Sequence, residues 1–354
     1  WESIEHEVLP YHWSNSNKLF QDFIYLDGIY ERHLCLLADR LNAIHKTSFS
    51  IRYWRILVGP WLKKFLVIFY DRYLSITSAI KTRKVSNAWL PIWNSSDFIP
   101  IDYANFQTWV TEDEYNHYLY GWLIKNLEGI SYEIKGNIPC VLPKNLRHSS
   151  QSLGLFKNVI RNLLEFYFRL VPEYWKKVVF ASSYLSSWEL IKLQVSLGQA
   201  PNPCTPRVIL KNERIDKDLR EKLVFPEKGD QFESLITKII PIQIPKIYLE
   251  GYEIFRQKSI KYFPKKTKII YTTNALYANE GFKFWAAERL ESSGKLIVGQ
   301  HGGTYGSALW SDNESHEIKV SDKYFTWGWN DKNEPKLIPV PAAPLIKTKG
   351  EIIP

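Results

Sequence analysis

The chain has 354 residues, of which 45% are hydrophobic and 23% charged, a composition typical of soluble globular proteins. Its length suits two or three domains, or one large α/β unit with a helical addition. Its formal net charge of +9 favours anionic partners, such as phosphorylated small molecules, acidic lipid surfaces or nucleic acid. No Lys/Arg run resembles a nucleic-acid-binding arm, and pairs such as Lys63-Lys64, Lys176-Lys177 and Lys265-Lys266 are typical of solvated faces or strand flanks. Nucleic acid is therefore not an expected partner.

The three cysteines, Cys35, Cys140 and Cys204, lie far apart and show no CxxC spacing. Neither a thiolate metal site nor a disulfide framework is expected from them, and this usage favours a reducing cytoplasm. No signal peptide opens the chain. The sequence also contains no Met and begins at Trp1, so we expect that methionines and further segments are missing from it.

The first 85 residues are predicted to be helical. From Leu19 to Ile44 apolar residues recur at steps of three and four, which marks one face of a helix, and the SNSN stretch at 14–17 offers N-cap candidates. A second helix is expected from Ser50 to Ile80, with Pro60 kinking or restarting it. Two long helices so close in sequence favour an antiparallel hairpin.

The second helix contains the most apolar stretch of the chain. Because charged residues interrupt this stretch, it is predicted to be a buried helix and not a membrane span. Arg52, Arg55, Asp71 and Arg72 are expected to form ion pairs within the protein. Binding of an anionic ligand and contact with the inner membrane leaflet near a lipid-linked acceptor remain as alternatives.

Residues 86–150 have a mixed pattern, with a helix expected near Glu112 to Lys125, and a further helix is expected from Leu153 to Leu170. Residues 1–170 are thus predicted to form a mainly helical region. The charged, proline-containing stretch 205–248 is expected to be an insertion or a connection.

From residue 171 short apolar runs alternate with helices, which predicts a parallel sheet covered on both faces. Residues 171–345 are therefore predicted to form a Rossmann-like α/β domain, and 346–354 to begin a linker or a second such domain. Helices are expected at 188–197 and 280–290. The predicted strands are 178–181, 268–272, 296–299, 324–327 and 337–340.

Polar loops follow three of these strands, around Ser183, around Thr273, and from Gln300 to Gly306. Since the carboxyl ends of parallel strands share one edge, the loops are expected to converge there. Glycines in the third loop would let backbone N–H groups approach a ligand, although a tight turn capped by His301 is the alternative. The candidate donor- or substrate-binding residues are Gln300, Gly302, Gly303, Thr304, Tyr305, Gly306, Thr273, Asn274 and Ser183.

His301, at the end of a strand, could act as a general base on an acceptor hydroxyl or donate a hydrogen bond to phosphate. The NESHE stretch adds Glu314, His316 and Glu317, of which a carboxylate could act as base, bind a sugar hydroxyl or orient a histidine. A solvated loop is the alternative. No metal is expected, because HExxH and a second ligand cluster are absent. The phosphate-binding signatures GxxxxGK[ST] and GxGxxG are absent as well.

Two long motifs, GQHGGTYG…ESHEIKVSDKYFTWGW and HKTSFSIRYWRILVGPWLKKFLVIFYDRY, together with VLPYHW, resemble transferases encoded in bacterial O-antigen and surface-polysaccharide clusters. The resemblance covers residues 1–85 and 265–345. It implies a GT-B glycosyltransferase with two Rossmann-like domains, of which the second would follow the end of this chain. It also implies catalysis without a metal ion, because helix dipoles and basic side chains hold the departing phosphates.

The QHGG turn is also similar to that of CDP-glycerol glycerophosphotransferases, which implies His301 as the catalytic base. The Trp that commonly precedes that histidine is Gln300 here. We therefore expect a cytoplasmic enzyme, with or without peripheral contact at the inner membrane face. It would transfer a sugar from a nucleotide-activated donor to a glycan or lipid-linked glycan, without a bound cofactor. The alternatives are a CDP-polyol phosphotransferase and a non-catalytic glycan-binding or assembly subunit.

Overall fold

The computed structural model describes residues 7–82, 85–136, 142–143, 163–164, 166–168, 170–202, 208, 213–226 and 229–342. The chain divides into two compact units, each assembled from three separate segments. Unit 1 comprises Trp1–Thr47, Trp61–Asn145 and Asn212–Glu250, and unit 2 comprises Ser48–Pro60, Leu146–Lys211 and Gly251–Pro354. The sequence analysis predicts one boundary near residue 170, whereas the two units interleave along the chain.

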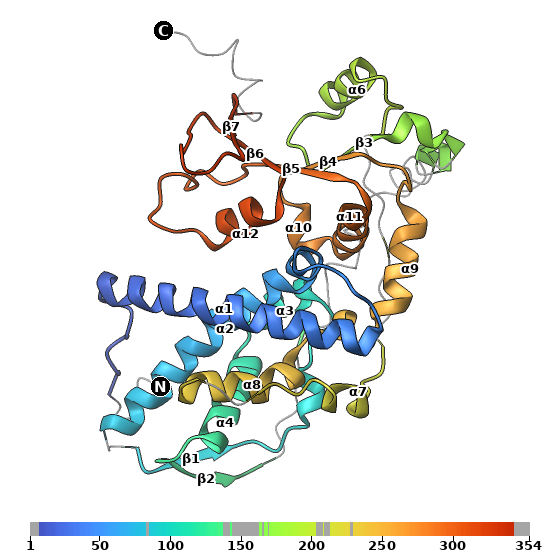
Figure 1. Ribbon diagram of the computed structural model, residues 1–354. Coiled ribbons are helices and arrows are strands. Elements are labelled where there is room, and N and C mark those ends of the chain that lie inside the picture. Colours follow the sequence, from blue (N-terminus) through green and yellow to red (C-terminus); the bar gives the residue numbers. More distant parts are fainter. Residues whose placement is uncertain are drawn as a thin grey trace. The chain divides into compact units, whose positions relative to one another are not determined.

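Unit 1 consists mainly of helices (Figure 1). Its elements are α1 (Ser16–His45), the part of α2 (Ile51–Thr82) from Trp61 onward, β1 (Asn87–Leu90), η1 (Ser95–Phe98), α3 (Tyr103–Trp109), α4 (Asp113–Asn126), β2 (Ser131–Ile134), α7 (Lys217–Glu221), α8 (Gln231–Gln243) and η3 (Lys246–Tyr248). Strands β1 and β2 pair in parallel, so that β1, α3, α4 and β2 form a βαβ crossover. The helix predicted near 112–125 is confirmed by α4, and most of the helix predicted at 153–170 lies outside the described residues.

Helix α1 begins where the sequence analysis places its cap. The Asn15 side chain accepts hydrogen bonds from the backbone N–H groups of Asn17 and Lys18, which have no partner inside the helix. At the other end Lys46 takes a left-handed conformation with φ of 55° and stops the helix. The buried stripe runs through Leu26, Ile29 and further residues at helical spacing, as expected of a half-buried helix.

Helix α2 is continuous through Pro60, so the predicted restart of the helix does not occur. Within unit 1, Lys63 Nζ lies 3.0 Å from Asp27 Oδ1 of α1, and the Tyr70 hydroxyl lies 3.4 Å from Asp22 Oδ1. Later residues of α2 thus meet earlier residues of α1, the order that the predicted antiparallel arrangement requires.

The side chains of α2 leave little apolar surface for a membrane, since Trp54, Leu57 and Trp61 are fully buried. These buried side chains are not available to contact a lipid leaflet. In the described part of the chain, no helix has the length and apolar character needed to cross a bilayer.

The stretch 205–248, expected to be an insertion or a connection, supplies a packed helix to unit 1. The Phe232 ring of α8 lies 4.7 Å from the Tyr70 ring and 5.2 Å from the Tyr73 ring, centroid to centroid. Two hydrogen bonds of 3.0 Å join Arg32 of α1 to Glu233 of α8. Charged residues interrupt the apolar pattern of this segment, so the sequence analysis did not predict its apolar helix face.

Unit 2 contains a parallel sheet of five strands, in the order β3-β4-β5-β6-β7. The strands are β3 (Val178–Ala181), β4 (Ile269–Thr272), β5 (Lys295–Gly299), β6 (Lys323–Thr326) and β7 (Leu337–Pro339), and each predicted strand is confirmed to within one residue at its ends. The helices are η2 (Glu173–Lys176), α6 (Ser187–Ser196), α9 (Tyr252–Tyr262), α10 (Ala275–Ala278), α11 (Glu280–Ser292) and α12 (Asp312–Val320). The predicted α/β class with a Rossmann-like parallel sheet is confirmed.

Among the described strands, spatial order follows chain order, so strand order does not reverse at a switch point. Right-handed crossovers that always step in the same direction place their helices on one face. The helices α10, α11 and α12 lie on one side of the sheet as this rule requires, whereas α6, part of the longer connection from β3 to β4, lies on the other (Figure 1). The sheet is predicted to be covered on both faces, and on the second face the side chains of Phe180, Tyr271 and Phe325 are half-buried.

A buried ion pair ties α7 to the end of α8 in unit 1. Arg220 donates to both carboxylate oxygens of Glu250, at 2.6 and 2.9 Å, and to the carbonyls of Pro241, Ile242 and Ile244. The two charged side chains are 8% and 4% exposed. Loss of one partner would therefore leave a desolvated charge without compensation.

We predict that Arg220→Ala lowers the free energy of unfolding by about 3–5 kcal/mol, measured by urea denaturation. The control is Lys135→Ala, which removes a pair to Glu133 whose side chains are about half exposed. That exposed pair should contribute less than about 1 kcal/mol. Equal effects of the two substitutions would contradict the assignment of Arg220 as a buried anchor.

Candidate active site

The loops at the carboxyl edge of the unit 2 sheet are joined by hydrogen bonds. After β4, the Thr273 N–H donates to the Ser182 carbonyl after β3, at 3.2 Å. After β5, the Gln300 N–H donates to the Phe325 carbonyl of β6 at 2.8 Å, and the Trp327 N–H donates to Gln300 Oε1 at 2.8 Å. The geometry thus brings the strand-end loops together, as the parallel arrangement requires.

At this edge His301 meets the carboxylate of Glu317 from α12. The Nδ1–Oε1 distance is 3.2 Å, an ion-pair contact whose N–H direction falls outside that of a well-aligned hydrogen bond. The Glu317 side chain is completely buried, whereas that of His301 keeps 18% of its surface exposed. The imidazole therefore has a buried carboxylate on one side and access to solvent on the other.

Three tyrosine hydroxyls surround the same carboxylate. Tyr277 of α10 donates to Oε1 at 2.8 Å, Tyr324 of β6 donates to Oε2 at 3.1 Å, and Tyr305 lies 3.4 Å from Oε1. The Tyr305 hydroxyl also lies 3.3 Å from Nε2 of His301. Glu317 thus links α10, α12, β6 and the glycine loop.

Burial raises the pKa of the Glu317 carboxyl above its ordinary value. The His301 imidazole offsets part of this change, and so do the hydroxyls of Tyr277 and Tyr324, because each stabilises the ionised form. Burial, followed by the charge of Glu317, also raises the pKa of Tyr305 and Tyr324, which keeps both phenols protonated as donors.

His316, one residue before Glu317, is buried, and neither ring nitrogen has a hydrogen-bond partner. Burial, together with the nearby cations Arg55, Lys283 and Lys319, lowers its pKa to about 3. His316 is therefore neutral at physiological pH and does not share the exposure of His301. Its ring lies 5.9 Å from that of Tyr277, which in turn lies 6.0 Å from the ring of His301.

The other acidic candidate, Glu314, holds the glycine loop. Its Oε2 accepts a 2.7 Å hydrogen bond from the backbone N–H of Gly306, whose φ of 73° lies in the left-handed region. The Ser311 hydroxyl accepts from the Glu314 N–H and caps α12. These contacts suit a residue that shapes the loop.

Several predicted ligand-binding residues are occupied within the protein. Gln300 is buried, donates to the Gly302 carbonyl and accepts from Trp327 and Trp329. Ser183 Oγ accepts from the Leu185 N–H, and Thr273 Oγ1 donates to the Ser182 carbonyl. The predicted residues that remain partly or fully exposed at the edge are Gly302, Gly303, Thr304, Gly306 and Asn274.

Sequence reasoning did not identify Tyr277, Tyr324, Arg55 or Lys283 as part of this site. Tyr277 comes after a predicted polar loop, and Tyr324 occupies an inward-facing position in a predicted strand. At both positions the sequence pattern is that of an ordinary core residue. Only the packing of α10 and β6 against α12 brings their hydroxyls to one carboxylate. Within the described residues, no group of three or more His, Cys, Asp and Glu side chains could hold a metal ion.

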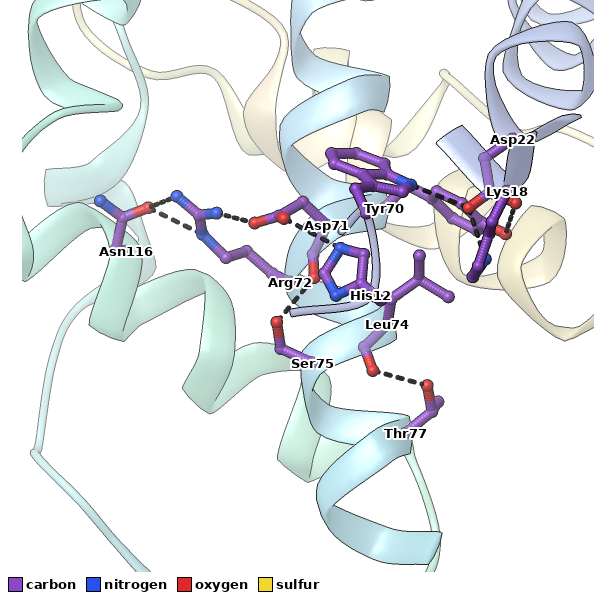
Figure 2. A network of polar contacts seen from close by, with 11 residues as sticks. His12, Lys18, Asp22, Tyr70, Asp71, Arg72, Leu74, Ser75, Thr77 and Asn116 are labelled. Atoms are coloured by element: carbon purple, nitrogen blue, oxygen red, sulfur yellow. Dashed lines mark hydrogen bonds and ion pairs between the residues drawn. The ribbon is translucent and has the colours of Figure 1, made fainter. Parts of the chain in front are cut away.

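The predicted internal pairing of the α2 charges is confirmed for three residues. Arg52 Nη2 lies 2.7 Å from Asp322 Oδ2, within unit 2. In unit 1 Arg72 pairs with Asp71 and donates from Nε and Nη2 to Asn116 Oδ1, at 3.1 and 2.8 Å (Figure 2).

The VLPYHW segment reaches the same network of unit 1. Nε2 of His12 lies 3.0 Å from the second carboxylate oxygen of Asp71, and the Trp13 indole donates to Asp22 at 2.8 Å (Figure 2). Burial lowers the pKa of His12, and the Asp71 carboxylate offsets part of this change. The network therefore fastens the segment before α1 onto α2.

The lowered pKa of His316 predicts a contribution to the pH dependence of stability. The unfolded state takes up a proton near pH 6.5 and the folded state only near pH 3, so this contribution is present above 6.5 and is lost as the pH falls. We predict that His316→Leu loses less stability between pH 7 and pH 5 than the unmodified protein, by urea denaturation at both pH values. An equal loss in the two proteins would contradict a neutral, buried His316.

Comparison with known proteins adds one finding to this geometry. No curated protein and no solved structure gives a significant match to the chain. The model of the LIC12162 family transferase matches residues 1–351, which is nearly the whole sequence. The chain, with its strand-end histidine and buried carboxylate, therefore belongs to the LIC12162 family of transferases.

Proposed function

We propose that this transferase moves a sugar from a nucleotide-activated donor to a glycan or lipid-linked glycan of the bacterial surface, with His301 as general base. The observation that carries the proposal is the contact of His301 with the buried Glu317 at the carboxyl end of β5. A partly exposed imidazole held by a buried carboxylate is suited to removing a proton from a bound hydroxyl. The family supports transfer chemistry of this kind.

In the proposed reaction Glu317 holds Nδ1 of His301, which directs Nε2 toward the acceptor. Nε2 takes the proton of the acceptor hydroxyl while that oxygen bonds to the anomeric carbon of the donor. The bond from that carbon to the phosphate oxygen breaks, and the nucleotide leaves with the bonding electrons. The positive charge formed on His301 is stabilised by the ionised Glu317.

The Tyr305 hydroxyl marks the place of the acceptor oxygen. It lies within 3.4 Å of both Nε2 of His301 and Oε1 of Glu317. Because Tyr305 can donate to the carboxylate instead, Nε2 is available for a substrate hydroxyl. The exposed backbone of Gly302 and Gly303 offers N–H groups to a phosphate or sugar oxygen beside it.

A CDP-polyol phosphotransferase remains the second candidate, because the same histidine would serve as base and the QHGG turn supports it. There the acceptor oxygen would attack phosphorus, so the product would contain a phosphodiester that phosphorus analysis detects. A non-catalytic glycan-binding or assembly subunit would need neither His301 nor a nucleotide.

The first test is nucleotide binding by calorimetry, using CMP, CDP, UDP, GDP, ADP and dTDP, alongside a transfer assay. We predict selective binding of one nucleotide, and a loss of turnover of about 10²–10⁴-fold in His301→Ala with nucleotide binding kept. Glu317→Gln should lose turnover as well, because the amide cannot stabilise the imidazolium.

Glu314→Gln is the matched control, since an amide oxygen can still accept the hydrogen bond from the Gly306 N–H, and it should retain most activity. If Glu314→Gln were the more damaging substitution, the base would be reassigned to that carboxylate. If His301→Ala kept full biological activity and no nucleotide bound, the catalytic proposal would fail and the assembly-subunit alternative would take its place.

The pKa of Glu317 provides a second test. Tyr324→Phe removes a hydroxyl that stabilises the ionised carboxylate, so the pKa of Glu317 should rise further. We predict that the acid limb of the kcat/KM profile moves to higher pH in this variant. Tyr271→Phe, a control on the other face of the same sheet, should leave the pH profile unchanged. If the unmodified protein and both variants had equal profiles, Glu317 would not need to be ionised for activity.

A further inference from the structure

Unit 2 exposes an unusual number of large apolar side chains in the stretch around η2 and α6. Six of them are between 52% and 69% exposed, namely Phe166, Leu170, Tyr174, Trp175, Trp188 and Val195. We refer to these six residues as the aromatic surface. Water-exposed apolar area of this kind on one part of a protein marks an interaction site.

Hydrogen bonds join η2 and the start of β3 to the segment just after α6. The Ala200 N–H, just beyond α6, donates to the Trp175 carbonyl of η2 at 2.9 Å. The Val178 N–H donates to the Gln199 side chain at 3.0 Å. On α6 itself, Trp188 and Val195 are two turns apart on the outward face, opposite the buried Leu190.

Lysines surround the aromatic rings. Lys177 Nζ lies 3.6 Å from the centre of the Tyr174 ring, and Lys192 Nζ lies 5.3 Å from the centre of the Trp188 ring. The exposed pair Lys265 and Lys266 is brought to η2, because both backbone N–H groups donate to Glu173, at 2.8 and 3.0 Å. The fold thus brings positive charges from distant parts of the sequence to one place.

The described carboxylates of the same stretch are engaged within the protein. Glu173 accepts from those two backbone groups and from Lys176 Nζ at 3.3 Å. Glu189 accepts from the Ser186 N–H at 2.8 Å and closes the capping box of α6. The surface therefore presents apolar rings, aliphatic side chains and ammonium groups, and its partner should be apolar and anionic.

We propose that the aromatic surface docks unit 2 on a membrane that contains anionic phospholipids. Trp and Tyr rings are stable at the headgroup boundary, where their apolar bodies leave water and their polar atoms stay hydrated. Lysine stems lie along the rings while their ammonium groups contact lipid phosphates. Nucleic acid fits less well, because exposed aliphatic side chains such as Leu170 and Val195 contribute nothing to base stacking.

This inference stands apart from the chemistry of His301 and would also bring the enzyme to a lipid-linked acceptor. The test is sedimentation of the full chain with phosphatidylglycerol/phosphatidylcholine vesicles and with pure phosphatidylcholine vesicles, at low and high salt. We expect binding only to the anionic vesicles, and weaker binding as salt rises. In Lys265→Gln/Lys266→Gln, binding should fall roughly fivefold for each charge removed.

Trp175→Ala/Trp188→Ala should bind the anionic vesicles at least about tenfold more weakly, since both rings leave the interface. The matched control is Trp89→Ala in unit 1, which removes a 68%-exposed Trp whose ring also lies beside a lysine, Lys135. This control and His301→Ala should bind vesicles like the unmodified protein. Circular dichroism and size-exclusion chromatography of each variant establish its folding and its oligomeric state.

Three outcomes would overturn the proposal. They are the absence of vesicle binding by the folded chain, equal binding by the control and the double Trp variant, and a double Trp variant that loses only self-association. Binding of single-stranded nucleic acid in place of vesicles would assign the surface to that partner. Since His301→Ala separates turnover from vesicle binding, failure of this proposal and failure of the proposed reaction are distinguishable.

Discussion

The arrangement of the candidate active site, at the carboxyl edge of the unit 2 sheet, depends on one buried carboxylate. An ionised Glu317 without contacts would be too costly to bury, so the fold surrounds it with His301 and tyrosine hydroxyls. Each partner comes from a different element, which means that the charge can be accommodated only when α10, α12, β6 and the glycine loop are all in place. The same requirement that stabilises the edge also orients the imidazole.

The chemistry of the site follows from differences in burial between neighbouring residues. His301 and His316 lie 15 positions apart in the sequence and both lie close to Tyr277, yet only His301 is exposed. Cations and burial keep His316 neutral, whereas His301 has a carboxylate beside it. The two histidines are therefore suited to different tasks, one within the packed interior and one at the surface where a substrate hydroxyl can arrive.

Three other charged side chains illustrate how polar groups of the described residues are used for structure. Arg220, Arg52 and Asp71 each satisfy carbonyls or opposite charges within their own unit. Many of the aromatic residues belong to the hydrophobic core, as the fully buried Trp54, Trp61 and Trp285 show. Several of the rings that stay exposed lie around η2 and α6, where lysines accompany them.

Much of the secondary structure could be predicted from the sequence, because periodicity and capping are local. The cap at Asn15, the helix through α4 and all five strands of the unit 2 sheet could be predicted from residues close together in the chain. The strand-end position of His301 could be predicted as well, since a histidine followed by glycines after an apolar run is a local signal.

Only the tertiary structure decided what these elements do together. The assignment of 212–250 to unit 1 depends on the apolar face of α8, which charges along the sequence conceal. The separate roles of Glu314 and Glu317, three residues apart, depend on which side of α12 packs against the sheet. Burial and pairing between residues far apart in the sequence set the pKa values of the site and the make-up of the aromatic surface. A local sequence pattern carries no information about either.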